Sequence, residues 1–571
     1  MSSSVPFVPD SAPFTPAQRA WLNGFFAGAF SRAPVHSSAS PESPAESLSP
    51  LTILWGSQTG TAESLAKQAA KEAGKRGFAP TVIDMATTTT TDLSTTQNLL
   101  VITSTYGDGE PPDNAKALHD ALLSPDAATV PASLRYTVCA LGDTNYELFC
   151  QCGKNMDEAL AKLGATRITE RVDCDVDYDD DYAKWLDTAL GALSEGNASP
   201  ALSAAQEPGP TEPESAPAYG KKNPFPAPVL TVRNLNGEGS AKEVNHVEFS
   251  LKDSGLTYET GDALAVLPTN DPDLVAQVLT ALGCDGEEAV TTSVGEQPLR
   301  AALASNLDLG KPSPKLLAAL NLSASDDIVD VLDAIQAASR PLPSLADLVA
   351  NFKKLQPRLY SISSSPKAHP GEVHLTVGAV RYTVGDRARK GVCSTFLAER
   401  AVAAGTAGVF VHANKAFRPP ADPNLPMIMV GPGTGIAPFR AFLEERTATA
   451  ATGKNWLFFG DQHAATDYLY QEQIGDWQKS GLLSRVDTAF SRDQAQKIYV
   501  QDRMREAGAE LWSWLEAGAH FYVCGDAKRM AKDVDAALHD IITEYGKKSP
   551  EEAAEFVQEL KTTKRYARDV Y

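Results

Sequence analysis

Apolar, strand-like segments alternate with helical segments in two separate stretches of the chain, residues 51–193 and 426–571. In the first stretch, the segments LTILWG, LLVITS and YTVCALG are each followed by a helical pattern. In the second stretch, the strand-like segments are PMIMVG, NWLFFG, SRVDTAF and HFYVCG. Because parallel strands need a crossover connection, usually a helix, this order predicts a doubly wound parallel sheet first and a second α/β unit at the end.

The residues outside these two stretches have a different character. Residues 224–425 contain further strand-like segments, with an insert at about 270–356 that reads as helical throughout. Two stretches rich in Ser, Pro and Ala, 33–50 and 194–223, are typical of linkers, and residues 14–31 are expected to form a short helix. The predicted organisation is an N-terminal helical segment with a Ser/Pro linker at 1–50, an α/β unit at 51–193, a flexible linker at 194–223, a β unit with its helical insert at 224–425 and a second α/β unit at 426–571.

The composition argues against several classes of protein. A formal net charge of −21 disfavours nucleic acid or an anionic membrane as the main partner. The sequence has no run of about 18 apolar residues, and its first residues lack the basic and apolar regions of a signal peptide, so we expect a cytoplasmic protein.

Seven cysteines in 571 residues fit reduced thiols better than a disulfide framework, and the spacing around Cys150 and Cys152 does not resemble a zinc site. We therefore expect no metal.

Three loops are expected at the carboxyl ends of strands in the first α/β unit, where ligands of open parallel sheets bind. The first, residues 56–62, is rich in small and hydroxylated residues and leads directly into a helix, which suits a phosphate or simple helix capping. The second, residues 104–115, and the third, residues 141–150, offer the rings of Tyr106 and Tyr146 for stacking or for packing. A phosphate cradle with two loop aromatics describes a site for a flat, phosphorylated heteroaromatic, and FMN fits this description.

Further candidate ligand groups lie in the second half of the chain. In RLYSISSS, Arg358 is a fixed cation that suits a pyrophosphate, or else forms a surface ion pair. The segment GVCSTFL, which starts at residue 391, again opens a helix with small residues. In SRDQAQKIYVQ, the side chains of Ser491, Arg492 and Lys497 suit the 2′-phosphate of NADPH, or else form a solvated basic turn.

These motifs occur together, and in this order, in a known family. STYGDGEPPDNA and LGDTNYELFCQCGKNMD resemble the FMN loops of diflavin reductases, and RLYSISSS resembles the Arg-x-Tyr-Ser motif of a ferredoxin-reductase-type FAD barrel. GKNWLFFGDQH, YVCGDAKRMAKDV and RYARDVY are most similar to the flavoprotein subunits of NADPH-dependent sulfite reductases, as is the N-terminal FTPAQRAWLNGFFAGAF. The resemblance implies a multidomain α/β protein with a flavodoxin-like doubly wound sheet, a ferredoxin-reductase-like FAD β-barrel with a helical connecting insert, and an α/β NADP-binding domain.

The resemblance also implies which residues bind each cofactor. For FMN they are Ser57, Gln58, Thr59, Gly60, Thr61, Ala62, Ser104, Thr105, Tyr106, Gly107, Leu141, Gly142, Asp143, Thr144, Asn145, Tyr146, Glu147, Leu148, Phe149 and Cys150. For FAD they are Arg358, Leu359, Tyr360, Ser361, Thr376, Val377, Gly378, Tyr382, Gly391, Val392, Cys393, Ser394 and Tyr571. For NADPH they are Ser491, Arg492, Lys497, Ile498, Tyr499, Val500, Gln501 and Asp533, with Tyr499 and Gln501 expected on a strand.

Four residues are implied to take part in the reaction. By the resemblance, Tyr571 covers the isoalloxazine ring of FAD and is displaced by the nicotinamide. Asp569, beside Ser361 and Cys524, is implied to orient the nicotinamide and to stabilise charge. From the residues alone, two other roles stay open. Cys524 can be a buried residue that packs in the core after a strand, and Tyr571 can fill a groove at the surface. At Gly310 the family has an FAD-contacting Thr, so no contact is assigned there.

The implied function is electron transfer from NADPH through FAD to FMN, and onward to a sulfite reductase hemoprotein (beta) subunit that reduces sulfite to sulfide in cysteine biosynthesis. The N-terminal segment is implied to act in homo- or hetero-oligomer assembly, and the 194–223 linker is expected to let the FMN domain move. The acidic stretch at 170–185 is either a docking surface for the hemoprotein or a solvated turn. Two alternatives stay open: a stand-alone NADPH-cytochrome or small-acceptor reductase, and a flavin-binding electron carrier without nicotinamide chemistry.

Overall fold

The computed structural model describes Thr15, Arg19 and residues 48–107, 109–144, 146, 148–195 and 219–571. The predicted helix at 14–31 and most of the two predicted linkers lie outside these residues, apart from Thr15 and Arg19. The chain divides into two compact units, Met1–Ser49 and Pro50–Tyr571. The elements described below belong to the second unit, except that its first strand begins at Ser49.

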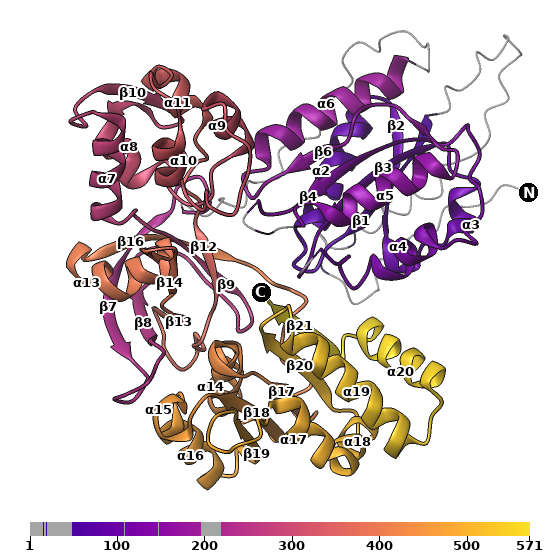
Figure 1. Ribbon diagram of the computed structural model, residues 1–571. Coiled ribbons are helices and arrows are strands. Elements are labelled where there is room, and N and C mark those ends of the chain that lie inside the picture. The colour runs from indigo at the N-terminus through magenta and orange to yellow at the C-terminus, as the bar shows by residue number, and fades with distance from the viewer. Residues whose placement is uncertain are drawn as a thin grey trace, which may run out of the picture. The chain divides into compact units, whose positions relative to one another are not determined.

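The first α/β stretch forms one sheet, here called the flavodoxin-like unit, with the strand order β2-β1-β3-β4-β5 and with β6 paired to β4 (Figure 1). Its strands are β1 (Ser49–Gly56), β2 (Phe78–Asp84), β3 (Asn98–Ser104), β4 (Arg135–Leu141), β5 (Thr166–Arg167) and β6 (Val172–Cys174). Its helices are α2 (Thr61–Lys75), η1 (Met85–Thr87), α3 (Thr90–Leu93), α4 (Lys116–Leu123), α5 (Gln151–Lys162) and α6 (Asp179–Glu195). The pairs β1·β3, β3·β4, β4·β5 and β4·β6 are parallel.

Two apolar cores show how this sheet is covered. Side chains of α2 and α6 pack in one core, with Leu51 and Ile53 of β1. Side chains of α4 and α5 pack in a second core, with Leu54 of the same strand. Because neighbouring residues of a strand point to opposite faces, the two helix pairs cover opposite faces of the sheet. This arrangement confirms the predicted doubly wound sheet.

The middle of the chain forms an antiparallel sheet with the strand order β12-β9-β16-β7-β8-β13. Its strands are β7 (Phe225–Asn234), β8 (Val244–Ser250), β9 (Ala263–Leu267), β12 (Arg358–Ser361), β13 (Glu372–Gly378) and β16 (Thr406–His412). A bridge between Ile362 and Leu375 joins the two end strands, so the sheet closes on itself into the predicted barrel. The hairpin β14 (Arg381–Val384) and β15 (Arg387–Lys390) and the helical turns α12 (Val392–Thr395), η2 (Phe396–Arg400) and α13 (Ala401–Ala404) complete it.

The insert between β9 and β12 is mostly, but not entirely, helical. It contains α7 (Pro272–Leu282), α8 (Leu299–Ser305), α9 (Pro314–Ala319), α10 (Val331–Ala337) and α11 (Leu345–Asn351). The prediction of helix throughout 270–356 is wrong at β10 (Ala289–Thr292) and β11 (Gly295–Pro298), which form an antiparallel hairpin. The physical reason is the β-branched run from Val290 to Thr292, followed by Gly295 with a φ of +111° at the turn.

The last stretch forms a parallel sheet, here called the C-terminal sheet, with the strand order β19-β18-β17-β20-β21. Its strands are β17 (Met427–Val430), β18 (Asn455–Asp461), β19 (Leu483–Phe490), β20 (His520–Gly525) and β21 (Tyr566–Val570). Its helices are η3 (Gly433–Ile436), α14 (Ala437–Ala448), α15 (Ala464–Asp467), α16 (Gln471–Lys479), α17 (Val500–Glu506), α18 (Gly508–Glu516), α19 (Met530–Gly546) and α20 (Pro550–Thr562). Every residue of β18 is buried, as expected for a strand with helices on both faces.

One local prediction in this sheet is wrong. Tyr499 and Gln501 were expected on a strand, but Tyr499 is the N-cap of α17 and Gln501 lies in its first turn. The reason is Asp502, whose carboxylate accepts a hydrogen bond from the Tyr499 backbone N–H at 2.8 Å and so starts a helix.

Two further observations concern membranes and thiols. Among the described residues, no helix has the length and apolarity needed to cross a bilayer. All seven cysteines fall within the described ranges and none is in a disulfide. Six of them are buried, which suits small apolar packing groups.

Two buried histidines lie where the barrel meets the C-terminal sheet. His246 of β8 and His374 of β13 have ring centroids 5.1 Å apart and exposed fractions of 3% and 2%. From α14, the guanidinium of Arg440 donates to the Ser363 carbonyl at 2.6 Å and pairs with Glu444 at 2.7 Å. His374 also takes part in two clusters of His and Glu side chains whose nitrogen and oxygen atoms lie within 4.8 Å of one another. These atoms already form hydrogen bonds and ion pairs with one another, and the expectation of no metal stays a prediction.

We expect this histidine pair to make the fold less stable in mild acid. Burial, with the charge of Arg440, lowers the pKa of His246 and of His374 from 6.5 to about 3. Between these values the unfolded chain binds more protons than the folded chain, so the free energy of unfolding falls as the pH falls. At about pH 5 each histidine contributes a loss of at most about 2 kcal/mol. Urea unfolding midpoints at about pH 7.5 and about pH 5 measure the effect.

The double variant His246→Gln/His374→Gln is expected to lose much of this pH dependence. A matched control is His539→Gln, because His539 lies at the partly exposed surface of α19. An unchanged pH dependence in the double variant would show that the buried pair is not its source.

Candidate active site

The three predicted FMN loops meet at the carboxyl ends of β1, β3 and β4. The Thr105 N–H donates to the Leu141 carbonyl at 2.9 Å, which joins the second loop to the third. The Gln58 side-chain amide donates to the Asp113 carboxylate at 2.9 Å, which joins the first loop to the second. The structure therefore brings together three segments that are separated by 41 and 25 residues in the sequence.

The first loop combines helix capping with groups that suit a phosphate. The Ser57 hydroxyl oxygen accepts hydrogen bonds from the Gly60 N–H at 2.9 Å and the Ala62 N–H at 3.3 Å, so it caps α2. Gly60 has a φ of +93°, a left-handed conformation that favours glycine. The hydroxyls of Thr59 and Thr61 lie 3.3 Å apart beside this helix start. Since the N-terminus of a helix attracts anions, capping and phosphate binding are compatible here.

The two predicted loop aromatics lie in different surroundings. Tyr146 is 45% exposed and lines the large cavity described below. The hydroxyl oxygen of Tyr106 accepts a hydrogen bond from the Val570 N–H of β21 at 3.1 Å, a contact that the sequence did not predict. The predicted FMN residues Asn145 and Glu147 lie outside the residues that the structure describes.

The other predicted FMN residues lie within the same three loops. The Thr144 hydroxyl donates to the Asp175 carboxylate at 2.6 Å, and the Ser104 hydroxyl donates to a backbone carbonyl of the first loop at 3.3 Å. The side chains of Leu141 and Cys150 are buried, so only their backbone groups can face a ligand. The remaining predicted positions in the loops are Gly107, Gly142, Asp143, Leu148 and Phe149.

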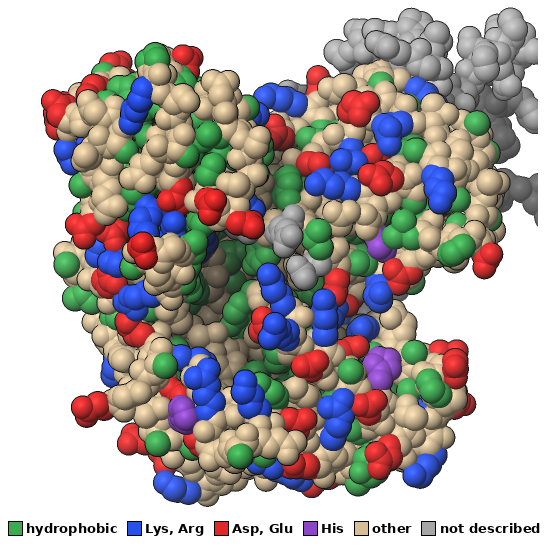
Figure 2. Space-filling model, in the orientation of Figure 1, with side chains coloured by type: hydrophobic (Ala, Val, Ile, Leu, Met, Phe, Trp, Pro, Cys, Tyr) green, Lys and Arg blue, Asp and Glu red, His purple; other side chains and the backbone are tan. Residues whose placement is uncertain are grey.

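A cavity of about 2190 Å³ extends from the third loop along the barrel to the C-terminal sheet. Its mouth is visible in Figure 2, with Lys and Arg side chains near its rim. This volume exceeds the roughly 300–1,000 Å³ of ordinary ligand pockets, so the cavity has room for more than one ligand. The predicted FAD residues that line it are Arg358, Leu359, Tyr360, Ser361, Thr376, Gly378, Tyr382, Gly391, Val392, Cys393, Ser394 and Tyr571.

Val377 differs from the other predicted FAD residues, because its side chain is 1% exposed and packs in the barrel core. Alternate residues of β13 point to opposite faces, which explains why its neighbours Thr376 and Gly378 line the cavity. For Val377, the predicted contact is therefore limited to its backbone groups.

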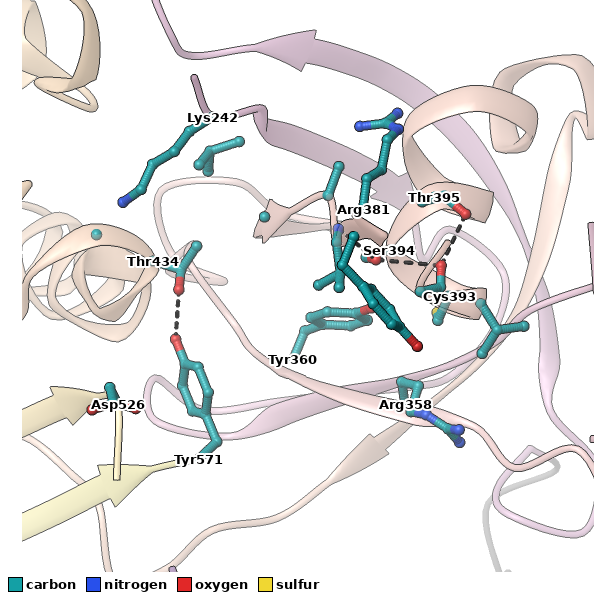
Figure 3. A pocket seen from close by; sticks show the side chains of 18 of the residues that line it. Lys242, Arg358, Tyr360, Arg381, Cys393, Ser394, Thr395, Thr434, Asp526 and Tyr571 are labelled. Atoms are coloured by element: carbon teal, nitrogen blue, oxygen red, sulfur yellow. Dashed lines mark hydrogen bonds between the residues drawn. The ribbon is translucent and has the colours of Figure 1, made fainter. Parts of the chain in front are cut away.

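Figure 3 shows Tyr571 on one side of the cavity, with Tyr360 in its middle and Arg358 and Cys393 on the opposite side. The guanidinium of Arg358 lies 3.6 Å from the Asp308 carboxylate of the insert and donates to the Gln356 carbonyl at 3.0 Å. An arginine fixed in this way inside a cavity presents a planar cation to an anionic ligand.

Three of the four predicted reaction residues, Ser361, Asp569 and Tyr571, line this cavity, and the fourth, Cys524, is buried beside Asp569. The Ser361 hydroxyl at the end of β12 donates to the Asp569 carboxylate of β21 at 2.5 Å. The Cys524 sulfur at the end of β20 lies 3.9 Å from the same carboxylate. Burial raises the pKa of Asp569, whereas its bonds to Ser361 and Cys524 act in the opposite direction. Burial also raises the pKa of the Cys524 thiol, so this thiol stays protonated at neutral pH.

The chain end is held in position by backbone and side-chain bonds. The Tyr571 N–H donates to the Gly525 carbonyl at 3.1 Å, and the Ala527 N–H donates to the Tyr571 carbonyl at 3.1 Å. The Tyr571 and Thr434 hydroxyls are 2.9 Å apart, and the Tyr571 side chain is about half exposed. The terminal ring therefore lies at the cavity with one side open, as a movable cover requires.

The predicted NADPH residues lie around the start of α17. Ser491, Tyr499, Val500, Gln501 and Asp533 line the cavity, and the Gln501 side-chain amide donates to the Asp533 carboxylate at 3.3 Å. Arg492 and Lys497 are exposed at the surface just outside this lining, and Ile498 packs against the core of the C-terminal sheet. Both cations are therefore accessible to water and to an anionic ligand.

Several cavity residues were not predicted. Lys242, from the connection between β7 and β8, forms an ion pair with Asp461 of β18 at 2.5 Å, and both line the cavity. No local pattern marks these two residues, which lie 219 positions apart. Thr434 lies in GPGTG, the Gly-rich turn that directly follows β17, and such a turn after an apolar strand is a signal by which Thr434 could have been found. Gly310, at which no contact was assigned, also lines the cavity, and its N–H donates to Asp308 at 2.7 Å.

Two buried oxygen atoms without a hydrogen-bond partner indicate what kind of ligand fits this cavity. Within the described residues, Asn414 Oδ1 and Asp461 Oδ2 are buried without a hydrogen-bond partner, and both residues line the cavity. Buried acceptors are normally satisfied, so a ligand that brings donors is expected here. Flavin and nicotinamide nucleotides bring such donors as ribose hydroxyls and amides, together with phosphates that suit Arg358 and Lys242. The residues present therefore fit these cofactors.

The acidic stretch forms ion pairs within the chain. Asp177 pairs with Lys354 at 2.7 Å, and Asp179 pairs with Lys221 at 2.8 Å. Asp179 is also the first residue of α6, where the helix dipole favours carboxylates. These contacts explain part of the acidic run without a partner protein, and the docking surface stays a prediction.

Comparisons with known proteins define the class of the chain. The flavodoxin family model matches residues 53–185, the FAD binding domain model matches 217–328 and 307–396, and the oxidoreductase NAD-binding domain model matches 429–536. The matches coincide with the flavodoxin-like unit, the barrel with its insert, and the C-terminal sheet. Together they define a flavin- and nicotinamide-nucleotide-dependent oxidoreductase.

Curated relatives narrow this class. The sulfite reductase (NADPH) flavoprotein alpha-component of Bacillus subtilis (strain 168) is 45% identical, over 98% of this chain and 96% of the relative. The alpha-components of Klebsiella pneumoniae subsp. pneumoniae and Escherichia coli O9:H4 are 42% and 41% identical, over 98% of this chain and 96% and 95% of those relatives. The chain belongs to the family of sulfite reductase (NADPH) flavoprotein alpha-components. The resemblance and the fold class predicted from the sequence are thereby confirmed.

Proposed function

We propose that this chain passes electrons from NADPH through FAD and FMN to a sulfite reductase hemoprotein subunit, which reduces sulfite to sulfide for cysteine biosynthesis. The observation that supports this most strongly is that Ser361, Asp569 and Tyr571 line the same cavity as Arg358 and Tyr360, with the buried Cys524 sulfur in contact with Asp569. Bound flavins would supply the exchange between a two-electron hydride donor and one-electron acceptors.

The proposal gives a task to each of these four residues. Asp569 holds the Ser361 hydroxyl by a 2.5 Å hydrogen bond and provides a buried negative charge beside the site for the nicotinamide. Cys524 adds a neutral, polarisable group beside the Asp569 carboxylate. Tyr571 covers the site when it is empty and excludes water, and its hydrogen bond to Thr434 is released when the ring moves aside.

The cofactor assignments implied by the resemblance are part of the same proposal. The FMN phosphate is proposed to bind at the start of α2, with Tyr106 and Tyr146 beside the flavin ring. The FAD pyrophosphate is proposed to bind Arg358 and the start of α12, and the 2′-phosphate of NADPH is proposed to bind Ser491, Arg492 and Lys497. The domain boundaries predicted from the sequence, at residues 51–193, 224–425 and 426–571, are retained with these assignments.

The partner and the location are also part of the proposal. The relatives carry the designation alpha-component, which supports assembly with a second, hemoprotein component. We place the assembly contact in residues 14–31, which lie largely outside the described residues, and leave the number of subunits open. Seven cysteines without a disulfide support a cytoplasmic location, where thiols stay reduced.

A reconstitution experiment tests the function. The purified chain, loaded with FAD and FMN, is mixed with the candidate sirohaem-containing hemoprotein from the same organism, and sulfide formation from sulfite and NADPH is measured. The proposal predicts sulfide only when both proteins are present. Rapid cytochrome c reduction without any sulfide would favour the stand-alone reductase, and no flavin reduction by NADPH would favour the simple electron carrier.

A further inference from the structure

One strand of the C-terminal sheet contacts both flavin sites. β21 is the edge strand of this sheet, and Asp569 and Tyr571 at its end reach the barrel cavity. Its other residues in this region, Arg568 and Val570, contact the second loop of the flavodoxin-like unit instead. Alternate residues of a strand point to opposite sides, so this short segment contacts both the barrel cavity and the flavodoxin-like unit.

The contact with the flavodoxin-like unit is largely buried. Arg568 forms an ion pair with Asp113, and the side chains are only 12% and 18% exposed. The guanidinium carbon of Arg568 also lies 5.6 Å from the centre of the Tyr106 ring. The hydroxyl oxygen of that ring accepts the Val570 N–H at 3.1 Å. Removing one member of such a buried pair leaves the other charge without its partner in a desolvated place, which costs more than the loss of an exposed ion pair.

Asp113 links Arg568 to the predicted phosphate loop. The Asp113 carboxylate accepts from the Gln58 side-chain amide at 2.9 Å, and its own N–H donates to the Gln58 side-chain carbonyl at 3.0 Å. Burial alone would raise the pKa of Asp113, but the charges of Arg568 and Lys561 and the hydrogen bonds from Gln58 and Arg568 together outweigh burial, so the pKa is lowered. The carboxylate is therefore ionised at neutral pH and pairs with Arg568 as a charge.

Two weaker contacts support the same junction. Lys532 of α19 pairs with Glu110 at 3.4 Å, and a side-chain carbon placed on Gly107 would lie 3.8 Å from the Ala527 side chain. Both Lys532 and Glu110 are about half exposed, so this pair contributes little. Ala527 is the residue whose N–H binds the Tyr571 carbonyl, so the junction lies next to the anchor of the chain end.

We propose that Arg568 and Tyr106 are positioning residues that couple docking of the flavodoxin-like unit to the position of the terminal Tyr571. When the second loop binds β21, it holds the strand that places Asp569 and Tyr571 at the cavity. When the nicotinamide displaces Tyr571, the strand end loosens and docking weakens by the same factor, because linkage between two equilibria is reciprocal. The proposal rests on the proposed function for what binds at the two sites.

Hydrogen exchange of the flavin-loaded, NADPH-free full chain tests this coupling. In Arg568→Ala, amide exchange is expected to rise at least about tenfold in two peptides, residues 103–115 and 564–571. The matched control is Arg505→Ala, which removes an exposed ion pair with Asp540 on the same sheet unit and should change neither peptide. NADP⁺ titration should show at least about threefold tighter binding in Arg568→Ala, because the cover is released more easily.

Two further variants keep the test decisive. Asp113→Asn removes the same ion pair from the other side. In the double variant Arg568→Ala/Asp113→Asn, amide exchange should be no faster than in the single variant that exchanges faster. Tyr106→Phe removes only the acceptor of the Val570 N–H and should speed exchange in residues 564–571 with the ion pair intact. The proposal is overturned if Arg568→Ala affects residues 564–571 but not 103–115, or if the single effects simply add.

This outcome does not depend on sulfite chemistry. Exchange and NADP⁺ binding need no turnover, so the coupling can be present in a chain that fails to support sulfide formation. Conversely, normal sulfide formation with unchanged exchange in all variants would refute the coupling and leave the proposed function intact.

Discussion

The Asp569→Asn variant is expected to reduce its bound FAD with NADPH about 100-fold more slowly than the unchanged chain. Asparagine has nearly the same shape and can still accept the Ser361 hydrogen bond, but it removes the buried negative charge. Positive charge develops on the nicotinamide ring as hydride leaves, and a preorganised carboxylate stabilises it. Anaerobic stopped-flow absorbance of the flavin measures the rate.

The pH profile provides a second readout of the same residue. Because burial raises the pKa of Asp569, the charged form is lost as the pH falls, and the rate should fall with it. This decline should be absent in Asp569→Asn. The matched control is Asp540→Asn, which removes an exposed carboxylate from α19 and should leave the rate unchanged. A normal rate in Asp569→Asn would show that the charge plays no part in the reaction.

The double variant Arg492→Ala/Lys497→Ala is expected to raise the KM for NADPH about 100-fold and to change the KM for NADH less than about threefold. Each charge-assisted hydrogen bond to a phosphate contributes about 1.5–3 kcal/mol, and NADH lacks the 2′-phosphate. Both side chains are exposed and outside the apolar core, so the fold should tolerate their loss. Steady-state kinetics with ferricyanide as the acceptor measures both constants.

The control for this variant is Lys479→Ala, which removes an exposed lysine of α16 that pairs with Asp476. Equal increases of KM for NADPH and NADH would indicate a general loss of nucleotide binding. That result would place the 2′-phosphate elsewhere on the C-terminal sheet.

The sequence was most informative where local pattern determines structure. The alternation of strands and helices predicted both parallel sheets, because a crossover helix is the usual way to join parallel strands. The loops at the carboxyl ends of β1, β3 and β4 were predicted from the same rule, and the structure brings them together. The terminal RYARDVY predicted that the chain end meets Ser361 and Cys524, although only through its resemblance to a family.

Contacts between distant segments could not be predicted in this way. Arg568 and Asp113 lie 455 positions apart. Each lies in a motif quoted above, but neither motif indicates that the two residues meet. The same holds for Lys242 and Asp461, which meet only because the barrel packs against the C-terminal sheet. The hairpin β10–β11 was missed for a different reason, because helical segments on both sides outweighed a short β-branched run around Gly295.

The most direct test of the two-flavin path is selective removal of FMN from the loaded chain. The FMN-depleted chain should still bleach its FAD absorbance with NADPH at the normal rate, but its reduction of the hemoprotein should fall at least about 100-fold and return when FMN is added. Reduction of the hemoprotein at the full rate without FMN would contradict the path through the flavodoxin-like unit.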